Sequence, residues 1–286
     1  MKLELVESFG NALSENMIIE SENITALEYL QEEFSGKIDV ITIDPPYNTD
    51  ISHIGYRDSN FENGWSTFIK ERLALAKILM SDAGSMFINI DENELVSLLE
   101  ICYDLFGKEN VNILVWPKID EPFDMNRVEK PVFNIKSAHE YIVLCYMDKK
   151  NTVFSNMRNG KPMESIIKGL GTTSSAKDEI AQLLGKREMF STPKPMRLLE
   201  EIIRISSQKD SIILDFFAGS GTTGHATMSL NKFDGGRRKF ILVTNDENDI
   251  CKNVTIPRIK KSIEVYNYRD GFNYYKLRSR YQCDLF

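Results

Sequence analysis

Two short loops carry the residue types that could do chemistry in this 286-residue chain. The first comprises Asp44, Pro45, Pro46 and Tyr47, and it directly follows the apolar run 38–43. The Asp44 carboxylate and the Pro45 carbonyl could accept both N–H bonds of a flat exocyclic amine, which would free the nitrogen lone pair to attack an electrophile. Proline fixes φ and donates no hydrogen bond, so the frame would be rigid. Tyr47 offers a ring face on which a base could stack after leaving its duplex.

A second loop, later in the chain, follows another apolar run with an acid and two closely spaced glycines. Its residues are Asp215, Phe216, Phe217, Ala218, Gly219, Ser220 and Gly221. The glycines permit a tight turn and a close approach of the backbone to a ligand, and Thr222 and Thr223 would begin a helix whose first amide groups are available donors. A strand, a glycine loop and a helix in this order are typical of a nucleotide-type site. The pattern is neither the GxGxxG fingerprint nor a P-loop.

The second loop suits a cofactor that has an amino-acid end and an adenosine end. Asp215 could bind an ammonium group, and the glycines would leave room for the rest of the molecule. A ribose would then require an acceptor after the next apolar run, where Asn245, Asp246 and Glu247 follow. For both loops a purely structural alternative exists, namely a strand that stops at two prolines and a helix that opens at a glycine.

Strand-like and helix-like segments alternate along most of the chain. Expected strands are 38–43, 84–90, 112–116, 140–147, 211–217 and 239–245, and expected helices are 24–34, 65–80, 92–106, 196–207, 221–231 and 254–266. Helices of this length between short β-branched runs indicate βαβ units and a mostly parallel sheet, so the expected fold class is α/β. Both loops would then lie at one edge of the sheet, because the carboxyl ends of parallel strands face the same side.

The stretch 117–190 breaks this alternation. It is polar, and its second half is rich in Gly, Asn and Ser. A long segment of this kind within a compact domain is either functional or disordered. We interpret 117–190 as a small inserted region in a domain made of 1–116 and 191–286.

The bulk composition limits the class of protein. A hydrophobic content of 42% fits one large domain, with or without an insertion. No apolar run approaches the length of a membrane-spanning helix, and the first residues lack the apolar core of a signal peptide. The four cysteines lie far apart without a CxxC pair and the three histidines are scattered, so we expect neither a metal site nor a disulfide framework. We therefore expect a cytoplasmic protein without a membrane segment.

The net charge of −7 is unevenly distributed along the chain. Residues 1–110 contain 7 basic and 21 acidic side chains, whereas 149–204 contain 11 basic and 6 acidic ones. Residues 252–286 contain 8 basic and 3 acidic side chains. The two basic segments permit a local surface for a polyanion such as DNA, although ordinary solvated faces explain the same counts.

The two loops resemble motifs of the amino methyltransferases, which use S-adenosylmethionine to methylate adenine N6 or cytosine N4 in DNA. Residues 44–47, DPPY, are similar to motif IV, and residues 217–221, FAGSG, are similar to motif I. Their order along the chain resembles that of the β class. Over 20–116 and 190–265 the chain is similar to the modification subunits of type III restriction systems.

This resemblance implies a Rossmann-like S-adenosylmethionine-dependent methyltransferase fold and direct methyl transfer to a base flipped out of double-stranded DNA. It assigns residues 44–47 to the target base, residues 215–221 to the cofactor, and the inserted region to target recognition. Lys194 and Pro195 are similar to motif X, which approaches the methionine end of the cofactor. DPPY in place of SPPY favours adenine over cytosine. The resemblance also implies a partner, either a second copy of the chain or a restriction or recognition subunit.

The chain departs from the family pattern in three places. The inserted region is shorter than in most type III subunits, Thr244 stands where many members have Glu, and Phe216 stands where proline is common. The ribose acceptor is therefore open between Asn245 and Glu247. Three other functions also stay open: a cytosine-N4 methyltransferase, a catalytically silent DNA-recognition subunit, and an enzyme that methylates RNA or a protein glutamine. Glutamine methylases normally carry Asn at the position of Asp44.

Overall fold

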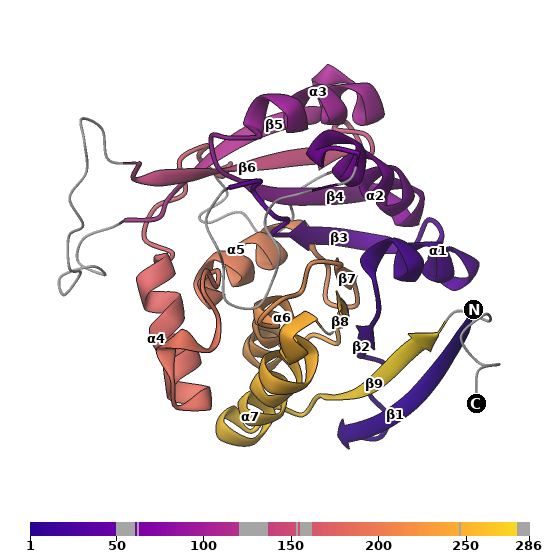
Figure 1. Cartoon of the computed structure of the whole chain (residues 1–286), viewed down its shortest axis with the longest axis vertical. Coiled ribbons are helices and arrows are strands. Elements are labelled where there is room, and N and C mark those ends of the chain that lie inside the picture. The colour runs from indigo at the N-terminus through magenta and orange to yellow at the C-terminus, as the bar shows by residue number, and fades with distance from the viewer. Residues whose placement is uncertain are drawn as a thin grey trace.

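The structure is a computed structural model of the chain, and it describes residues 1–49, 61, 63–119, 137–152, 154, 162–245 and 247–278. In this part of the chain, nine strands form one sheet in the order β1-β9-β2-β8-β7-β3-β4-β6-β5 (Figure 1). The strands are β1 (Lys2–Gly10), β2 (Met17–Glu20), β3 (Ile38–Ile43), β4 (Met80–Ile90), β5 (Val111–Pro117), β6 (His139–Tyr146), β7 (Ile212–Asp215), β8 (Lys239–Thr244) and β9 (Gly271–Arg278). The helices are α1 (Asn23–Phe34), α2 (Trp65–Leu79), α3 (Leu95–Phe106), α4 (Thr173–Leu184), α5 (Met196–Ser206), α6 (Thr222–Asp234) and α7 (Ile256–Tyr266).

The middle of the sheet is parallel. The pairs β9–β2, β2–β8, β8–β7, β7–β3 and β3–β4 are parallel, whereas β1–β9, β4–β6 and β6–β5 are antiparallel. Parallel strands that are covered on both faces consist of nearly continuous apolar residues, as β3 and β8 do. The expected α/β class with a mostly parallel sheet is confirmed.

Helices cover both faces of this sheet (Figure 1). The buried side chains of α1, α2 and α3 join one apolar core with the sheet, and those of α5 and α6 join a second core on the other face. A third core lies between α6, α7 and the strands β2, β8 and β9. The sheet is therefore the middle layer of a three-layer domain.

The strand order reverses direction between β3 and β7. These two strands are neighbours, with Val40 opposite Ile213 and Ile41 opposite Leu214. From β3 the chain continues towards β4 on one side, and from β7 it continues towards β8 on the other side. The loops after both strands thus leave the same edge at the point of reversal, which is where open α/β sheets form a ligand crevice.

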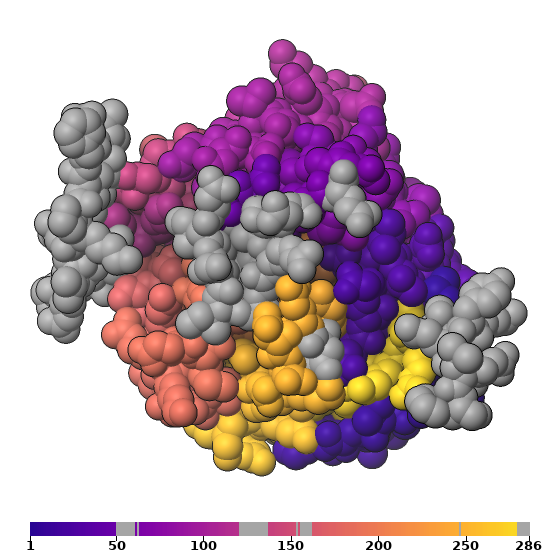
Figure 2. Space-filling view, viewed as in Figure 1, coloured from indigo at the N-terminus to yellow at the C-terminus, as the bar shows by residue number. Residues whose placement is uncertain are grey.

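Part of the region 117–190 belongs to the sheet of this domain, and another part lies outside the sheet. Strand β6 lies inside the region and pairs with both β4 and β5, so that part belongs to the sheet. Helix α4, also inside the region, packs against α7 on the face shown in Figures 1 and 2. The role of the region in target recognition stays a prediction.

Three strands and one helix were not expected from the sequence, namely β1, β2, β9 and α4. Strand β1 forms one edge of the sheet and β5 the other. Among the residues that the structure describes, no helix combines the length and the apolar character that crossing a bilayer requires.

Candidate active site

A cavity of about 930 Å³ lies at the carboxyl edge of the sheet, beside the ends of β3 and β7. Its walls come from the loop after β3, the glycine loop after β7, the residues before α5 and the residues after β8. Of the expected site residues, it is lined by Asp44, Pro46, Lys194, Asp215, Phe216, Phe217, Ala218, Gly219, Ser220, Asn245 and Glu247. The structure therefore brings the two loops into one cavity although they are distant in sequence.

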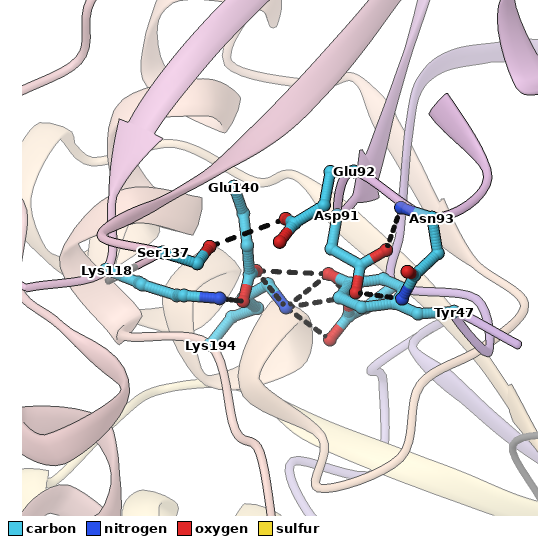
Figure 3. A network of polar contacts seen from close by, with 9 residues as sticks. Tyr47, Asp91, Glu92, Asn93, Lys118, Ser137, Glu140 and Lys194 are labelled. Atoms are coloured by element: carbon cyan, nitrogen blue, oxygen red, sulfur yellow. Dashed lines mark hydrogen bonds and ion pairs between the residues drawn. The ribbon is translucent and has the colours of Figure 1, made fainter. Parts of the chain in front are cut away.

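Four expected site residues do not border this cavity, namely Pro45, Tyr47, Pro195 and Gly221. Pro45 and Pro195 are buried, and Tyr47 directs its hydroxyl into a polar network beside the cavity (Figure 3). The base stacking expected of Tyr47 and the cofactor contact expected of Pro195 stay predictions.

The Lys194 ammonium lies directly against Asp44. Its Nζ donates to Asp44 Oδ1 at 2.7 Å and Oδ2 at 2.8 Å, and to the Tyr47 hydroxyl oxygen at 2.9 Å. The same Nζ is 3.2 Å from Oε2 of Glu140 on β6, and the Tyr47 hydroxyl lies 2.6 Å from Asp44 Oδ1 (Figure 3). The motif X lysine therefore contacts the acid of motif IV, and its expected approach to a cofactor stays a prediction.

The two carboxyl groups of this network have opposite pKa shifts. Burial raises the pKa of Asp44; Lys194 opposes the rise, whereas Glu140 adds to it. For Glu140, burial also opposes ionisation, but Lys194 and Lys118 together lower its pKa. The difference arises because Glu140 faces two lysines, whereas Asp44 faces one lysine and the negative charge of Glu140.

The loop after β3 is anchored from two neighbouring elements. The buried Trp65 at the start of α2 donates its indole N–H to the Pro46 carbonyl at 2.6 Å. Asn89 on β4 donates from Nδ2 to the Ile43 carbonyl at 2.9 Å. These bonds fix the backbone on either side of Asp44, so the carboxylate is presented from a rigid support. The sequence predicts a helix that begins at Trp65 but not this contact with the loop.

Asp215 ends β7 and organises the start of the glycine loop. Its Oδ1 accepts the Phe217 backbone N–H at 3.0 Å and its Oδ2 accepts the Thr223 hydroxyl at 2.5 Å. Burial nevertheless raises the pKa of Asp215 to about 7, and the nearby Asp44 charge contributes in the same direction. The site therefore contains a buried carboxyl group without a cationic partner among the described contacts, and a bound cation would favour its ionised form.

The two glycines of the loop have different surroundings. Gly219 has φ +45° and borders the cavity, and a Cβ there would lie 2.8 Å from the Phe190 ring. Gly221 has φ +76° and precedes α6, and a Cβ there would lie 3.2 Å from Thr255 at the start of α7. Both positions require the left-handed region that glycine adopts freely. Gly219 therefore lets the Phe190 ring lie close against the glycine loop at the cavity wall, whereas Gly221 lets α7 pack closely against the start of α6.

The far end of the cavity is polar and includes residues that sequence reasoning missed. Asn245 donates from Nδ2 to Glu22 Oε1 at 3.3 Å, and its own Oδ1 accepts the Glu247 backbone N–H at 3.4 Å. Glu22 follows the short strand β2, which pairs with β8, so both acids reach the same edge. Asp246 lies outside the described residues. An acid two residues after a strand was the available signal for Glu22, but β2 itself was not predicted.

Other residues that were not predicted complete the site. Arg72 of α2 borders the cavity and donates to Asn23 Oδ1 at 2.6 Å, and its guanidinium lies 3.6 Å from the centre of the Phe68 ring. Thr42 Oγ1 and Asn89 Oδ1 belong to cavity-lining residues, are buried, and have no hydrogen-bond partner within the described part of the chain. The cavity thus offers polar groups along its whole length.

Comparison with known proteins gives one family and several relatives. A family model described as DNA methylase matches residues 38–254. The Mod subunit of the type III restriction-modification enzyme StyLTI from Salmonella typhimurium strain LT2 is 28% identical over 348 aligned positions. The alignment covers 83% of this chain and 53% of that subunit, so the chain spans about half the length of this relative.

Two solved structures show the same fold. The complex of M1.HpyAVI with SAM has a TM-score of 0.56 at 20% identity, and the match covers 86% of this chain and 98% of that one. The PvuII DNA methyltransferase, described as cytosine-N4-specific, has a TM-score of 0.58 at 15% identity, with 89% and 92% covered. At these identities the likeness concerns the fold alone.

Proposed function

The chain belongs to the DNA methylase family, and from this premise we propose that it transfers a methyl group from S-adenosylmethionine to N6 of adenine in DNA. The single observation that carries the proposal is the shared cavity, which Asp44 borders together with the glycine loop. An acceptor for an amine and a loop suited to a nucleotide-like cofactor are the two parts that such a transfer needs.

The residues of the cavity fit S-adenosylmethionine. Asp215 is a buried acceptor that a cationic amino group would neutralise, and Gly219 borders the cavity beside Phe190 without a side chain of its own. Asn245, Glu247 and Glu22 supply acceptors at the far end, where a ribose and an adenine would need them. We propose that these residues hold the cofactor. When bound, the cofactor supplies a methyl group activated by a sulfonium.

The acceptor amine would be oriented by the loop after β3. Asp44 would accept one N–H of the adenine amino group, and the Pro45 carbonyl would accept the other. Holding both bonds favours tetrahedral geometry at nitrogen and leaves its lone pair directed at the methyl group. Most of the rate would come from this positioning and from the fixed polar groups around the amine. Asp44 acts as a hydrogen-bond acceptor in this scheme, and no covalent enzyme intermediate is needed.

Adenine is proposed over cytosine because residues 44–47 read DPPY rather than SPPY. The family includes both chemistries, and the PvuII enzyme that shares the fold is described as cytosine-N4-specific. The base must leave the duplex to enter a cavity at the sheet edge, since its amino group is otherwise inside the stack. Tyr47 is proposed to stack on the flipped base.

Target recognition is proposed to reside in 117–190, as the resemblance implied. Double-stranded DNA is the proposed substrate, and a second copy or a restriction or recognition subunit is the proposed partner. The printed description of the StyLTI relative as a Mod subunit of a restriction-modification enzyme supports a partner of this kind. The chain covers 53% of that subunit, so this partner is proposed from the matched part alone.

The proposal is tested by supplying methyl-labelled S-adenosylmethionine to the purified chain with duplex DNA, RNA or protein in separate reactions. Label should enter duplex DNA in preference to the other two. Cofactor binding without transfer to any DNA would instead support a silent recognition subunit, and transfer to RNA or protein alone would overturn the choice of substrate.

A further inference from the structure

The ammonium group of Lys194 contacts the carboxylates of both Asp44 and Glu140 beside the cavity. Lys194 Nζ lies within 3.2 Å of four oxygens, which belong to Asp44, Tyr47 and Glu140. An ammonium has three N–H donors, so these oxygens must share them. Lys194 therefore interacts with both carboxylates at the same time.

The two acids differ in their access to the cavity. The Asp44 side chain is 27% exposed and borders the cavity, whereas Glu140 is 10% exposed and Lys194 is 7% exposed. Glu140 is not among the cavity-lining residues, and its other oxygen lies 3.7 Å from Lys118. Figure 3 shows Glu140 reaching Lys194 and Tyr47 from β6. Glu140 thus acts on Asp44 from outside the cavity, through its contacts with Lys194 and Tyr47 and through its own negative charge.

We propose that Glu140 is a positioning residue: it holds Lys194 between two carboxylates, so that Lys194 keeps Asp44 ionised while leaving its oxygens able to accept an N–H bond from the substrate. This inference rests on the proposed function, in which Asp44 is the amine acceptor. It assigns to Lys194 a role at the acceptor end of the cavity, in addition to any contact with the cofactor.

The loss of Lys194 and the loss of Glu140 would each impair Asp44 as an acceptor, for different physical reasons. Without Lys194, burial and the neighbouring negative charges would favour a protonated Asp44, which would present a donor to the amine in place of an acceptor. Lys194 already donates to both Asp44 oxygens, and without Glu140 no second carboxylate would attract the ammonium, so Lys194 would compete more strongly with the substrate for these oxygens. Sharing the ammonium with Glu140 limits this competition, and each Asp44 oxygen keeps a further acceptor site, because a carboxylate can accept about four hydrogen bonds.

Several charged and titratable groups among the described residues act on this pair. Those that act on Asp44 include Lys194, Glu140, Tyr47 and Asp215, and those that act on Glu140 include Lys194, Lys118, Tyr47 and Asp91. Lys194 lowers the pKa of Asp44, whereas Glu140 raises it. Removing the two charges one at a time should therefore move the titration of Asp44 in opposite directions, which a merely structural role would not do.

The experiment combines a direct titration with an activity profile. The side-chain carboxyl ¹³C signal of Asp44, assigned by its loss in Asp44→Asn, is followed against pH in the wild type, Lys194→Met and Glu140→Gln. We expect the Asp44 pKa to rise in Lys194→Met and to fall in Glu140→Gln, because Lys194 lowers it and Glu140 raises it in the wild type. The acid limb of kcat/KM for duplex DNA, at saturating cofactor, should shift in the same two directions.

Lys70→Met is a matched control, since Lys70 makes a 2.7 Å ion pair with Asp104 on the exposed surface away from the cavity. It should leave the Asp44 titration and the profile unchanged. Lys194→Arg retains the charge and should keep the Asp44 pKa close to the wild-type value. Equal Asp44 pKa values in the wild type and Glu140→Gln, or shifts of the same sign in both variants, would overturn the inference. The ¹³C titration gives this result even if no methyl transfer is found, so failure of the proposed function is a separate outcome.

Discussion

At Asp44 the proposed chemistry depends on a carboxylate that is partly buried yet must accept a hydrogen bond. Replacing Asp44 with Ala removes that acceptor and leaves the glycine loop, which follows the neighbouring strand β7, in place. We expect methyl transfer to fall by at least about a hundredfold, as when a preorganised polar group is deleted from other active sites. Cofactor affinity, measured by titration calorimetry, should stay within about threefold of the wild type. Near-normal turnover in Asp44→Ala would contradict the mechanism.

The raised pKa of Asp215 predicts that protons are released when the cofactor binds. Its pKa is raised to about 7 by burial, so near neutral pH a large fraction of the free protein carries a proton on this group. A bound ammonium favours the carboxylate and lowers the pKa, so binding must release part of a proton. Calorimetry in two buffers of different ionisation enthalpy should detect this release in the wild type and not in Asp215→Asn.

S-adenosylhomocysteine provides the matched ligand for this measurement, because it keeps the ammonium and lacks the sulfonium charge. It should release the same fraction of a proton. Equal proton release by the wild type and Asp215→Asn would show that Asp215 does not bind the ammonium. Since the folded pKa lies above the ordinary value, the Asp215 contribution should also reduce the stability of the free protein as pH rises from about 4 to about 7.

At the scale of elements, α4 is connected to the glycine loop through a buried charge. Arg258 of α7 is fully buried and donates from Nη1 to Ser220 Oγ at 3.0 Å and Thr222 Oγ1 at 2.7 Å. Its Nη2 lies 3.7 Å from Glu179 Oε2 on α4, and the same oxygen accepts the Met196 backbone N–H at 3.0 Å. Helix α4 therefore contacts groups that position both the glycine loop and the start of α5.

Glu179→Gln should weaken cofactor binding about fivefold, equivalent to about 1 kcal/mol, because Arg258 then loses its charged partner while it still positions Ser220. Asp178→Asn is the matched control on the same helix, since Asp178 is exposed and pairs with Arg187 at 3.2 Å. Calorimetry gives the dissociation constant of the cofactor for Glu179→Gln and for Asp178→Asn, and the two values are compared. Equal effects of both variants would exclude a specific connection through Arg258.

The elements that the sequence predicted are those with a local signature. Strands β3 and β7 are short apolar runs followed by an acid, and α6 follows a glycine turn, so the two loops and their common edge could be predicted. Strands β1 and β9 could not be predicted, because each pairs with a strand at the opposite end of the chain. The contact between Lys194 and Glu140 was also out of reach, since it requires knowing that β6 lies beside β4.

Helix α4 was missed for a different reason. Its signals are present in the sequence: Thr172 and Ser175 form a capping box, and Gly185 ends the helix in the left-handed region. They lie in a polar stretch that breaks the alternation of strands and helices, and that composition predicts an insertion rather than a helix of the domain. A polar composition and a short capped helix are compatible, because only one side of α4 is buried.

For the whole molecule, a ligand that binds only the folded chain must stabilise it. S-adenosylmethionine at about 100 times its dissociation constant should add about 2.7 kcal/mol to the free energy of unfolding, which corresponds to a rise in Tm of about 5–10 °C. Asp44→Ala should keep this rise. Gly219→Val should lose it, because a branched side chain at φ +45° would contact Phe190 and distort the cavity wall.

A Tm rise in Gly219→Val as large as in the wild type would place the cofactor elsewhere. Thermal unfolding without ligand is the control, since it shows whether the variant folds before its response to the cofactor is compared.

The central claim is that one cavity presents an amine of DNA to a methyl donor, with Asp44 as the acceptor. The most direct measurement is mass spectrometry of nucleosides from duplex DNA incubated with the chain and deuterated S-adenosylmethionine. The account predicts labelled N6-methyldeoxyadenosine with the wild type and none above background with Asp44→Ala. Equal yields from both proteins would contradict the role of Asp44, and labelled N4-methyldeoxycytidine alone would contradict the choice of adenine.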